Sequence, residues 1–352
     1  MQLVAYGAQD IYLTGNPQIT FFKVVYRRHT NFSMESIEQT WNGTSTSLGS
    51  RCSATISRNG DLVHKLYLEL NVVQGGTANS NTGATLINNV VCEIGGQQID
   101  KQYGHFMEAW SELTQRNDAG HRGLLVADAT SATPGTRFQN MSGMGGSCSA
   151  GLATTLYVPL LFWFCRNPGL ALPLIALQYH EVKFNIDFNT KANITRNTTA
   201  GATLNSASLW VDYIYLDTDE RRRFAQVSHE YLIEQLQYTE MASSATSIDL
   251  NFNHPVKELI WVGMPASSTV STVTAGPGPG APFVINDKFG PGSMNAATTW
   301  KLKLNGHDRF AARDSRYFTR TQIWQHHTGY GGLSVVGEED SIAVYSFEIG
   351  RA

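Results

Sequence analysis

The chain has 352 residues, a formal net charge of −3, 42% hydrophobic residues and only 16% charged residues. So small a net charge gives too weak a field to favour binding of bulk nucleic acid. The longest apolar run, residues 156–165, is interrupted by Pro159 and is shorter than the ~20 residues that span a bilayer. A surface this poor in charge is typical of a protein covered by partners.

The N-terminal stretch YLTGNPQITFFKVVYRRHTNF, residues 12–32, combines a turn, an apolar run and two arginines. Its apolar residues lie on both faces of an extended segment, which one free sheet edge cannot cover. We expect residues 1–25 to form an arm, buried partly by its own domain and partly by neighbours. The assembly contacts predicted here are Phe21, Phe22, Arg27 and Arg28, the arginines because guanidinium groups bind carboxylates and backbone oxygens bidentately.

The next two hundred residues show the alternation of a β domain. In residues 61–73, leucines occupy every second position over much of the run, as in a half-buried strand. The exception is residues 102–117, where aromatic and leucine residues recur at spacings of three and four, which predicts an amphipathic helix. Further strands are predicted over residues 91–96, 156–164, 180–188 and 208–217, and long loops over residues 75–84 and 127–151.

A domain boundary is predicted near residues 215–232, where a strand runs into the charged segment DERRRF. Its arginines follow three acidic residues closely, so the segment is nearly balanced in charge. This pattern favours ion pairs between domains or subunits over phosphate binding. The arginines assigned to this contact are Arg221, Arg222 and Arg223.

The second half repeats the order of elements found in the first. Strands are predicted over residues 230–238, 256–264 and 300–306, and a short helix over residues 314–325. Aligning the halves places Gly96 opposite Gly306, each before a pair of aromatic residues seven apart, Tyr103/Trp110 and Tyr317/Trp324. Each half therefore reads as strands, a turn containing glycine, and a helix with aromatic anchors. The breaker-rich stretches 269–282 and 289–299 are predicted surface loops.

Motifs of catalysis and cofactor binding are absent from the sequence: no GxxxxGK[ST], HExxH or EF-hand spacing occurs. His326 and His327 are adjacent and point in different directions, so they do not chelate one metal as an i, i+4 pair would. The four cysteines are far apart, and no secretory signal precedes them, so we expect reduced thiols in a cytosolic protein. We expect neither a cofactor nor enzymatic activity.

Four segments resemble the major capsid proteins of nucleocytoplasmic large DNA viruses: GAQDIYLTGNPQITFFKVVYRRHTNFSMESIEQ, FWFCRNPGLALPLIALQYHEVKFNI, YLDTDERRRFAQ and HTGYGGLSVVGEEDSIAVYSF. The resemblance implies an all-β chain of two consecutive jelly-roll sandwiches with short helices in loops, residues 26–218 and 219–352. It also implies a homotrimer that forms a pseudohexagonal capsomer. Neighbouring capsomers would tile an icosahedral shell over an internal membrane with minor capsid proteins, in a virion assembled in the host cytoplasm.

The resemblance weakens at the C-terminus, where relatives continue past YSF. We expect the second jelly roll to lack its closing strands, which would make the chain less stable than a complete relative. Three explanations remain open: a truncated or divergent paralogue, the product of a split gene, or a minor capsid protein completed by a partner's strands. A carbohydrate-binding jelly roll is the second hypothesis. A nucleic-acid packaging protein is the third, although sequence-specific nucleic-acid binding is not expected.

Overall fold

The computed structural model describes residues 30–74, 82–115, 137–145, 153–190, 202–239, 247–262, 299–329, 331 and 342–347. The strands of the first half are β1 Phe32–Gln39, β2 Trp41–Gly43, β3 Arg51–Thr55, β4 Leu62–Gln74, β5 Ile87–Ile94, β6 Gln97–Tyr103, β7 Ala153–Pro159, β8 Leu172–Pro173, β9 Val182–Phe188 and β10 Ala202–Leu216. Its helices are α2 Thr82–Thr85, α3 Gly104–Thr114, α5 Arg137–Ser142, α6 Trp163–Arg166, η1 Pro168–Leu170 and α8 Thr218–Gln226.

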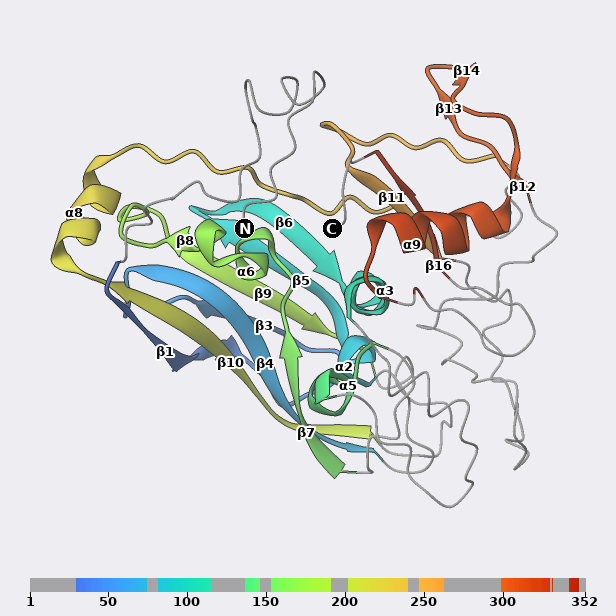
Figure 1. Ribbon diagram of the computed structural model, residues 1–352. Coiled ribbons are helices and arrows are strands. Elements are labelled where there is room, and N and C mark those ends of the chain that lie inside the picture. Colours follow the sequence, from blue (N-terminus) through green and yellow to red (C-terminus); the bar gives the residue numbers. More distant parts are fainter. Residues whose placement is uncertain are drawn as a thin grey trace, which may run out of the picture.

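The first half is a complete jelly roll (Figure 1). One sheet has the order β1-β10-β4-β7, with β8 also paired to β4, and the other has the order β2-β3-β9-β5-β6. Every pairing is antiparallel, and the last strand, β10, lies between β1 and β4. This return of the final strands between the early ones defines the jelly roll. The strands predicted over residues 61–73, 180–188 and 208–217 are β4, β9 and β10.

The core of the jelly roll lies between the two sheets, as the alternation in β4 predicts. Leu66, Leu68 and Leu70 are at most 1% exposed and belong to one cluster with Phe184 and Ile186 of β9. The residues between them are turned outward. Because burial of each such side chain contributes about 2 kcal/mol, this face fixes the register of β4.

The second half contains the strands β11 Glu258–Val262, β12 Thr299–Trp300, β13 Lys303–Leu304, β14 His307–Asp308, β15 Arg313–Asp314 and β16 Ile342–Ser346, and the helices η2 Tyr317–Thr321 and α9 Gln322–His326. Its described strands pair only two by two: β11 with β16, β12 with β15 and β13 with β14. Their core is an aromatic cluster in which Phe318 is buried, with Trp261 and Trp300 within 6 Å of its ring.

The internal repeat is visible in the backbone. Gly95 and Gly96 join β5 to β6, and both have positive φ, 60° and 81°. Asn305 and Gly306 join β13 to β14 with φ of 52° and 80°. A two-residue hairpin with positive φ at both positions is a type I′ turn, for which glycine and asparagine are suited. The predicted aromatic pair follows each hairpin: Tyr103 ends β6 and Trp110 lies in α3, whereas Tyr317 lies in η2 and Trp324 in α9.

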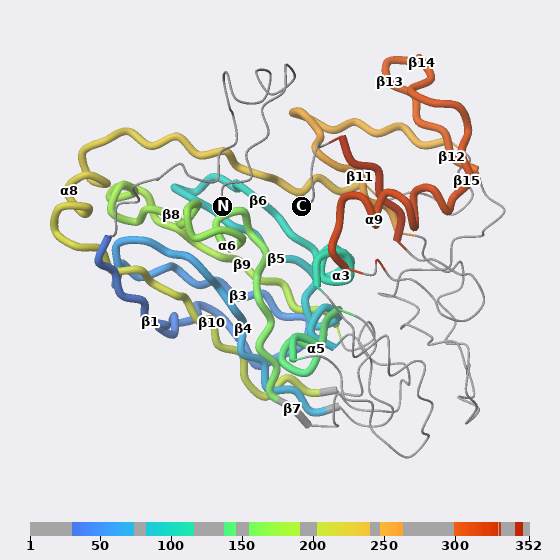
Figure 2. Tube along the Cα trace, in the orientation of Figure 1, coloured from blue at the N-terminus to red at the C-terminus, as the bar shows by residue number. Residues whose placement is uncertain are grey.

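Residues 230–238, predicted as a strand, form no strand in the structure. They belong to an extended segment that runs from α8 past β6 toward β11 (Figure 2). The equivalent strand of the first half, β1, is paired to β10 alone. Strand propensity does not produce a ladder when the described residues supply no neighbour. Residues 228–239 are called the connecting segment below.

Three other predictions need smaller corrections. The strand predicted over residues 156–164 ends at Pro159 and is followed by helix α6, because proline cannot donate to the ladder. Residues 127–151, predicted as a loop, contain α5. The charged segment near the boundary is helix α8, capped by the Asp217 side chain, which accepts from the Thr218 N–H at 2.7 Å. Among the helices in the described part of the chain, none has the length and apolar character needed to cross a membrane.

Candidate assembly surface and the contact between the two halves

Four of the residues predicted to mediate assembly, Phe21, Phe22, Arg27 and Arg28, lie outside the described residues. The other three lie on α8, the helix that follows the last strand of the first jelly roll. The structure therefore locates only the arginine cluster, Arg221, Arg222 and Arg223.

Arg221 forms an ion pair with Asp61 of the same chain. Its guanidinium group lies 2.9 Å from Asp61 Oδ1 and donates to Asp61 Oδ2 at 3.0 Å. The backbone N–H of Leu216 donates to the same Oδ2 at 2.8 Å. Because the Asp61 side chain is only 10% exposed, these donors replace the water it has lost. The sequence did not identify Asp61 as a partner, since the two residues are 160 positions apart.

Arg222 and Arg223 are exposed like Arg221, but they differ from it in their partners. Within the described residues, neither forms an ion pair or a side-chain hydrogen bond. They are fixed on a helix that begins at a capped N-terminus, so their backbone is in place before any partner arrives. Of the three arginines predicted on this helix, these two are the ones that the described residues leave without such a partner.

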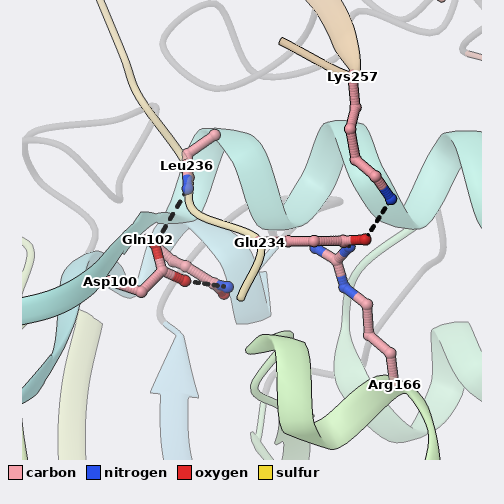
Figure 3. Close-up of polar contacts among 6 residues, drawn as sticks. All are labelled: Asp100, Gln102, Arg166, Glu234, Leu236 and Lys257. Atoms are coloured by element: carbon pink, nitrogen blue, oxygen red, sulfur yellow. Dashed lines mark hydrogen bonds and ion pairs between the residues drawn. The ribbon is translucent and has the colours of Figure 1, made fainter. Parts of the chain in front are cut away.

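The connecting segment is held against the first half by charge (Figure 3). The Glu234 carboxylate accepts from Arg166 of α6 and from Lys257, the residue before β11. All three side chains are partly exposed, so each pair alone contributes at most about 1 kcal/mol. The two ion pairs serve mainly to fix the connecting segment in place, because the one Glu234 carboxylate connects this segment to α6 and to the start of β11.

Asp100 forms the second anchor of the connecting segment. The Leu236 N–H donates to its Oδ1 at 3.0 Å, and the Gln102 side chain donates to Oδ2 at 3.2 Å (Figure 3). Burial raises the pKa of Asp100 above its ordinary value, although these hydrogen bonds oppose the rise. The rings of Tyr103 and Tyr238 meet nearby at 5.0 Å. The outer strand β6 is therefore covered by side-chain contacts instead of a further ladder.

The C-terminal turn of α3 is capped by the second half. The N–H groups of Gly329 and Gly331 donate to the carbonyls of Leu113 and Glu112 at 2.7 and 3.0 Å. The hydroxyl of Thr328 donates to the Thr114 carbonyl at 2.8 Å. The last carbonyls of a helix have no partner within it, so these three donors satisfy them. The segment 327–329, together with Gly331, thus joins the two halves.

His327, the first residue of that segment, is buried beside the cap. Its Nε2 contacts the carboxylate of Glu258 in β11, and its ring meets the edge of Trp110 at 6.0 Å. The guanidinium of Arg166 lies 4.5 Å from the Trp110 ring. His326 and His327 do not share a site, and in the described part of the chain no three His, Cys, Asp or Glu side chains cluster as metal ligands.

An apolar cluster completes this contact. Leu113 of α3, Ile323 of α9 and Val344 of β16 are all at most 4% exposed and belong to the same core. Because both halves contribute to this core, they form one mechanical unit and not two domains joined only by a linker.

The described cysteines show no sign of a reactive thiol. Cys52 and Cys92 are buried and unpaired, and burial raises the pKa of Cys52 to about 12. The arrangement suits a rigid building block.

Two family models match the chain in succession. Residues 20–217 match a model described as the major capsid protein N-terminus, and residues 220–351 match one described as large eukaryotic DNA virus major capsid protein. Together they cover nearly the whole sequence.

Curated relatives agree with these models. The major capsid protein of Pyramimonas orientalis virus is 52% identical over 336 residues, covering 93% of this chain and 75% of that protein. The major capsid protein of Paramecium bursaria Chlorella virus 1 is 42% identical over 380 residues, covering 99% and 80%.

Solved structures show the same likeness. A chain of the quasi-atomic model of the PBCV-1 virus capsid superimposes with a TM-score of 0.71 at 35% identity, covering 94% of this chain and 81% of that one. The Faustovirus major capsid protein shares the fold at a TM-score of 0.56 and 11% identity. The chain therefore belongs to the major capsid protein family of large eukaryotic DNA viruses.

Proposed function

We propose that three copies of this capsid shell protein form a pseudohexagonal capsomer, and that such capsomers tile an icosahedral shell. The observation that carries the proposal is the repeated hairpin-and-helix unit, which places two related units in one chain. Three chains around a threefold axis then present six similar units, so near-sixfold packing arises from threefold symmetry.

The proposal divides the chain into an arm of residues 1–25, a first jelly roll of residues 26–218 and a second of residues 219–352. The proposed boundary, between residues 218 and 219, is supported by the end of β10 at Leu216 and the start of α8 at Thr218. The proposed contacts with neighbouring chains are Phe21 and Phe22 on the arm, Arg27 and Arg28 at the start of the first jelly roll, and Arg222 and Arg223 on α8. Arg221 contributes by holding α8 against Asp61.

The remaining parts of the proposal concern what surrounds each capsomer in the virion. Capsomers would contact one another laterally and minor capsid proteins below, over an internal membrane, after assembly in the host cytoplasm. The low net charge supports a shell protein that does not bind nucleic acid sequence-specifically. The structural role of the relatives also supports a function without catalysis.

Size-exclusion chromatography with light scattering tests the proposal directly. The chain has a mass of 38.7 kDa, so a capsomer has three times that mass. The protein should be purified both alone and together with the other virion proteins, because neighbours contribute to assembly. A mass of one chain under both conditions would contradict the proposal.

A further inference from the structure

The outer side of the β11–β16 pair in the second half is covered by a helix of the first half. Trp261 and Ala343 are partners across these strands and face the aromatic core of the second half. The positions on either side of them face the opposite way and form one apolar cluster with α3. The strand residues of this cluster are Ile260, Val262, Ile342 and Val344, and the residues of α3 are Ala109 and Leu113. The helix of one half therefore covers the outer sheet face of the other.

The first half has an equivalent face on β4 and β7. The run VHKLYLE of β4 aligns with VKELIWV at β11, which places Leu68 opposite Trp261. Leu68 pairs with Val158 of β7. Trp261 pairs with Ala343 in the same way, so β7 corresponds to β16. The outward residues at the equivalent positions are Tyr67, Glu69, Tyr157 and Pro159. The repeat thus predicts that a helix also packs on this face.

The outer face of the first half is aromatic. Tyr157 is 39% exposed, whereas the equivalent Ile342 is 0% exposed. The Tyr67 ring stacks with Trp210 of β10 at 6.3 Å and meets Tyr157 edge-on at 6.1 Å. Trp210 Nε1 donates to Glu69 Oε2 at 2.8 Å, which fixes the indole ring. The rings of Tyr67, Tyr157 and Trp210 are called the aromatic face below.

Carboxylates border the aromatic face. Glu38 of β1 lies opposite Trp210 in the ladder and is exposed. Asp212 lies opposite Ser36, whose hydroxyl is 3.0 Å from the Tyr67 hydroxyl, so it shares the same side of the sheet. A surface of fixed rings and carboxylates suits a partner that offers an exposed ring together with cations.

The helices η2 and α9 present such groups. They follow the second hairpin as α3 follows the first. Trp324 of α9 is 70% exposed, while Phe318 and Ile323 are buried within their own chain. Residues 316–326 contain two arginines, both exposed, and no acidic residue. Because α9 lies across the molecule from β1 and β10 (Figure 1), a second copy of the chain is needed to bring these surfaces together.

We propose that η2 and α9 of one chain pack on the aromatic face of a second copy. The contact places Trp324 against the rings of Tyr67 and Tyr157, and Arg316 and Arg320 near the bordering carboxylates. It repeats between chains the cover that α3 gives to β11 and β16 within one chain. Two different surfaces meet, so the contact is heterologous and closes into a ring when its rotation permits. The inference rests on the proposed capsomer and names the surfaces by which each chain binds the next.

A double-variant comparison tests whether these rings touch. Trp324→Ala and Tyr157→Ala each remove one exposed ring and should weaken chain association, measured by sedimentation equilibrium, about tenfold or more. Together they should lose clearly less than the product of the two single losses, because either change alone breaks the same contact. Tyr179→Ala removes a ring that is 93% exposed elsewhere and should change association less than about twofold. Single variants that associate like the natural chain, or losses that multiply in full, would overturn the inference.

Cross-linking separates this inference from the proposed capsomer. A preparation with Tyr157→Cys is mixed with one carrying Gln325→Cys, the exposed residue after Trp324, and treated with a short bis-maleimide. Two-chain products should be at least about tenfold more abundant than in a control mixture of Tyr179→Cys with Gln325→Cys. Trimers that lack this cross-link overturn the inference and leave the capsomer standing. Cross-linked chains that never form trimers contradict only the capsomer, and the absence of both contradicts both.

Discussion

Gly329 donates its backbone N–H to the carbonyl oxygen of Leu113 at 2.7 Å, and so fixes the second half of the chain to the last turn of α3. A β-carbon on Gly329 would lie 2.2 Å from the Glu112 carbonyl oxygen. The glycine is therefore required by the close approach of two backbones.

Gly329→Ala should lower the free energy of unfolding by about 2–3 kcal/mol, because one of the two backbones has to move. Gly306→Ala is the matched control: its β-carbon meets nothing within 4 Å, and only its φ of +80° opposes the change. That control should cost about 1 kcal/mol. Urea unfolding of both variants measures the difference, and equal losses would show that the cap is not tight.

Asp100 should give the folded chain a measurable pH dependence. Burial raises its folded pKa above the ordinary value of 3.8, so the folded state binds this proton more tightly than the unfolded state does. Its contribution to stability is thus full below that ordinary value and is lost as the pH rises through the raised pKa. Asp100→Asn removes this dependence.

The measurement is the free energy of unfolding of both proteins across that range of pH. The stability of the natural chain minus that of Asp100→Asn should fall as the pH rises. Asp249→Asn makes the same chemical change at an exposed position and serves as the control. A difference that grows with pH would mean that the hydrogen bonds to Asp100 outweigh its burial.

The arginines of α8 should separate into two roles. Arg221→Ala leaves Asp61 nearly buried without its cation and should cost about 1–2 kcal/mol of stability. Arg222→Ala with Arg223→Ala should cost less than about 0.5 kcal/mol, because both side chains are exposed. The double variant should instead reduce capsomer yield, measured by light scattering. An unchanged yield would remove these two residues from the assembly surface.

The sequence predicts a structural feature best when that feature depends only on residues close to one another in the chain. Gly96 and Gly306 were correctly placed in turns because a type I′ hairpin depends on two residues. The helix of residues 102–117 was likewise found from its own period, as α3. The strand predicted over residues 230–238 was wrong because a strand also needs a neighbour, which no local pattern reveals.

The contact between the halves shows the same limit. Glu112 and Gly331 belong to different halves and are far apart in sequence, as are Asp61 and Arg221, so only the folded chain brings each pair together. No spacing rule connects them. Helix α8, by contrast, could have been found: Asp217 is a favourable N-cap, and Asp219 and Glu220 occupy its first turn.

The N-terminal arm remains a prediction that mutation can test. Replacing Phe21 and Phe22 with serine should reduce the yield of assembled particles while leaving the unfolding midpoint of the first jelly roll unchanged. Tyr179→Ser removes an aromatic side chain that is 93% exposed elsewhere on the surface and serves as the control. Particle yield that is equal in all three proteins would count against a role for the arm in assembly.

Electron microscopy of the purified protein, with its virion neighbours present, tests the central claim most directly. If one chain carries two jelly-roll units and three chains build a capsomer, class averages should show flat three-lobed particles with six subdomains. Uniform particles of one chain, with no threefold class and with binding to glycans, would contradict the shell function and favour a carbohydrate-binding jelly roll.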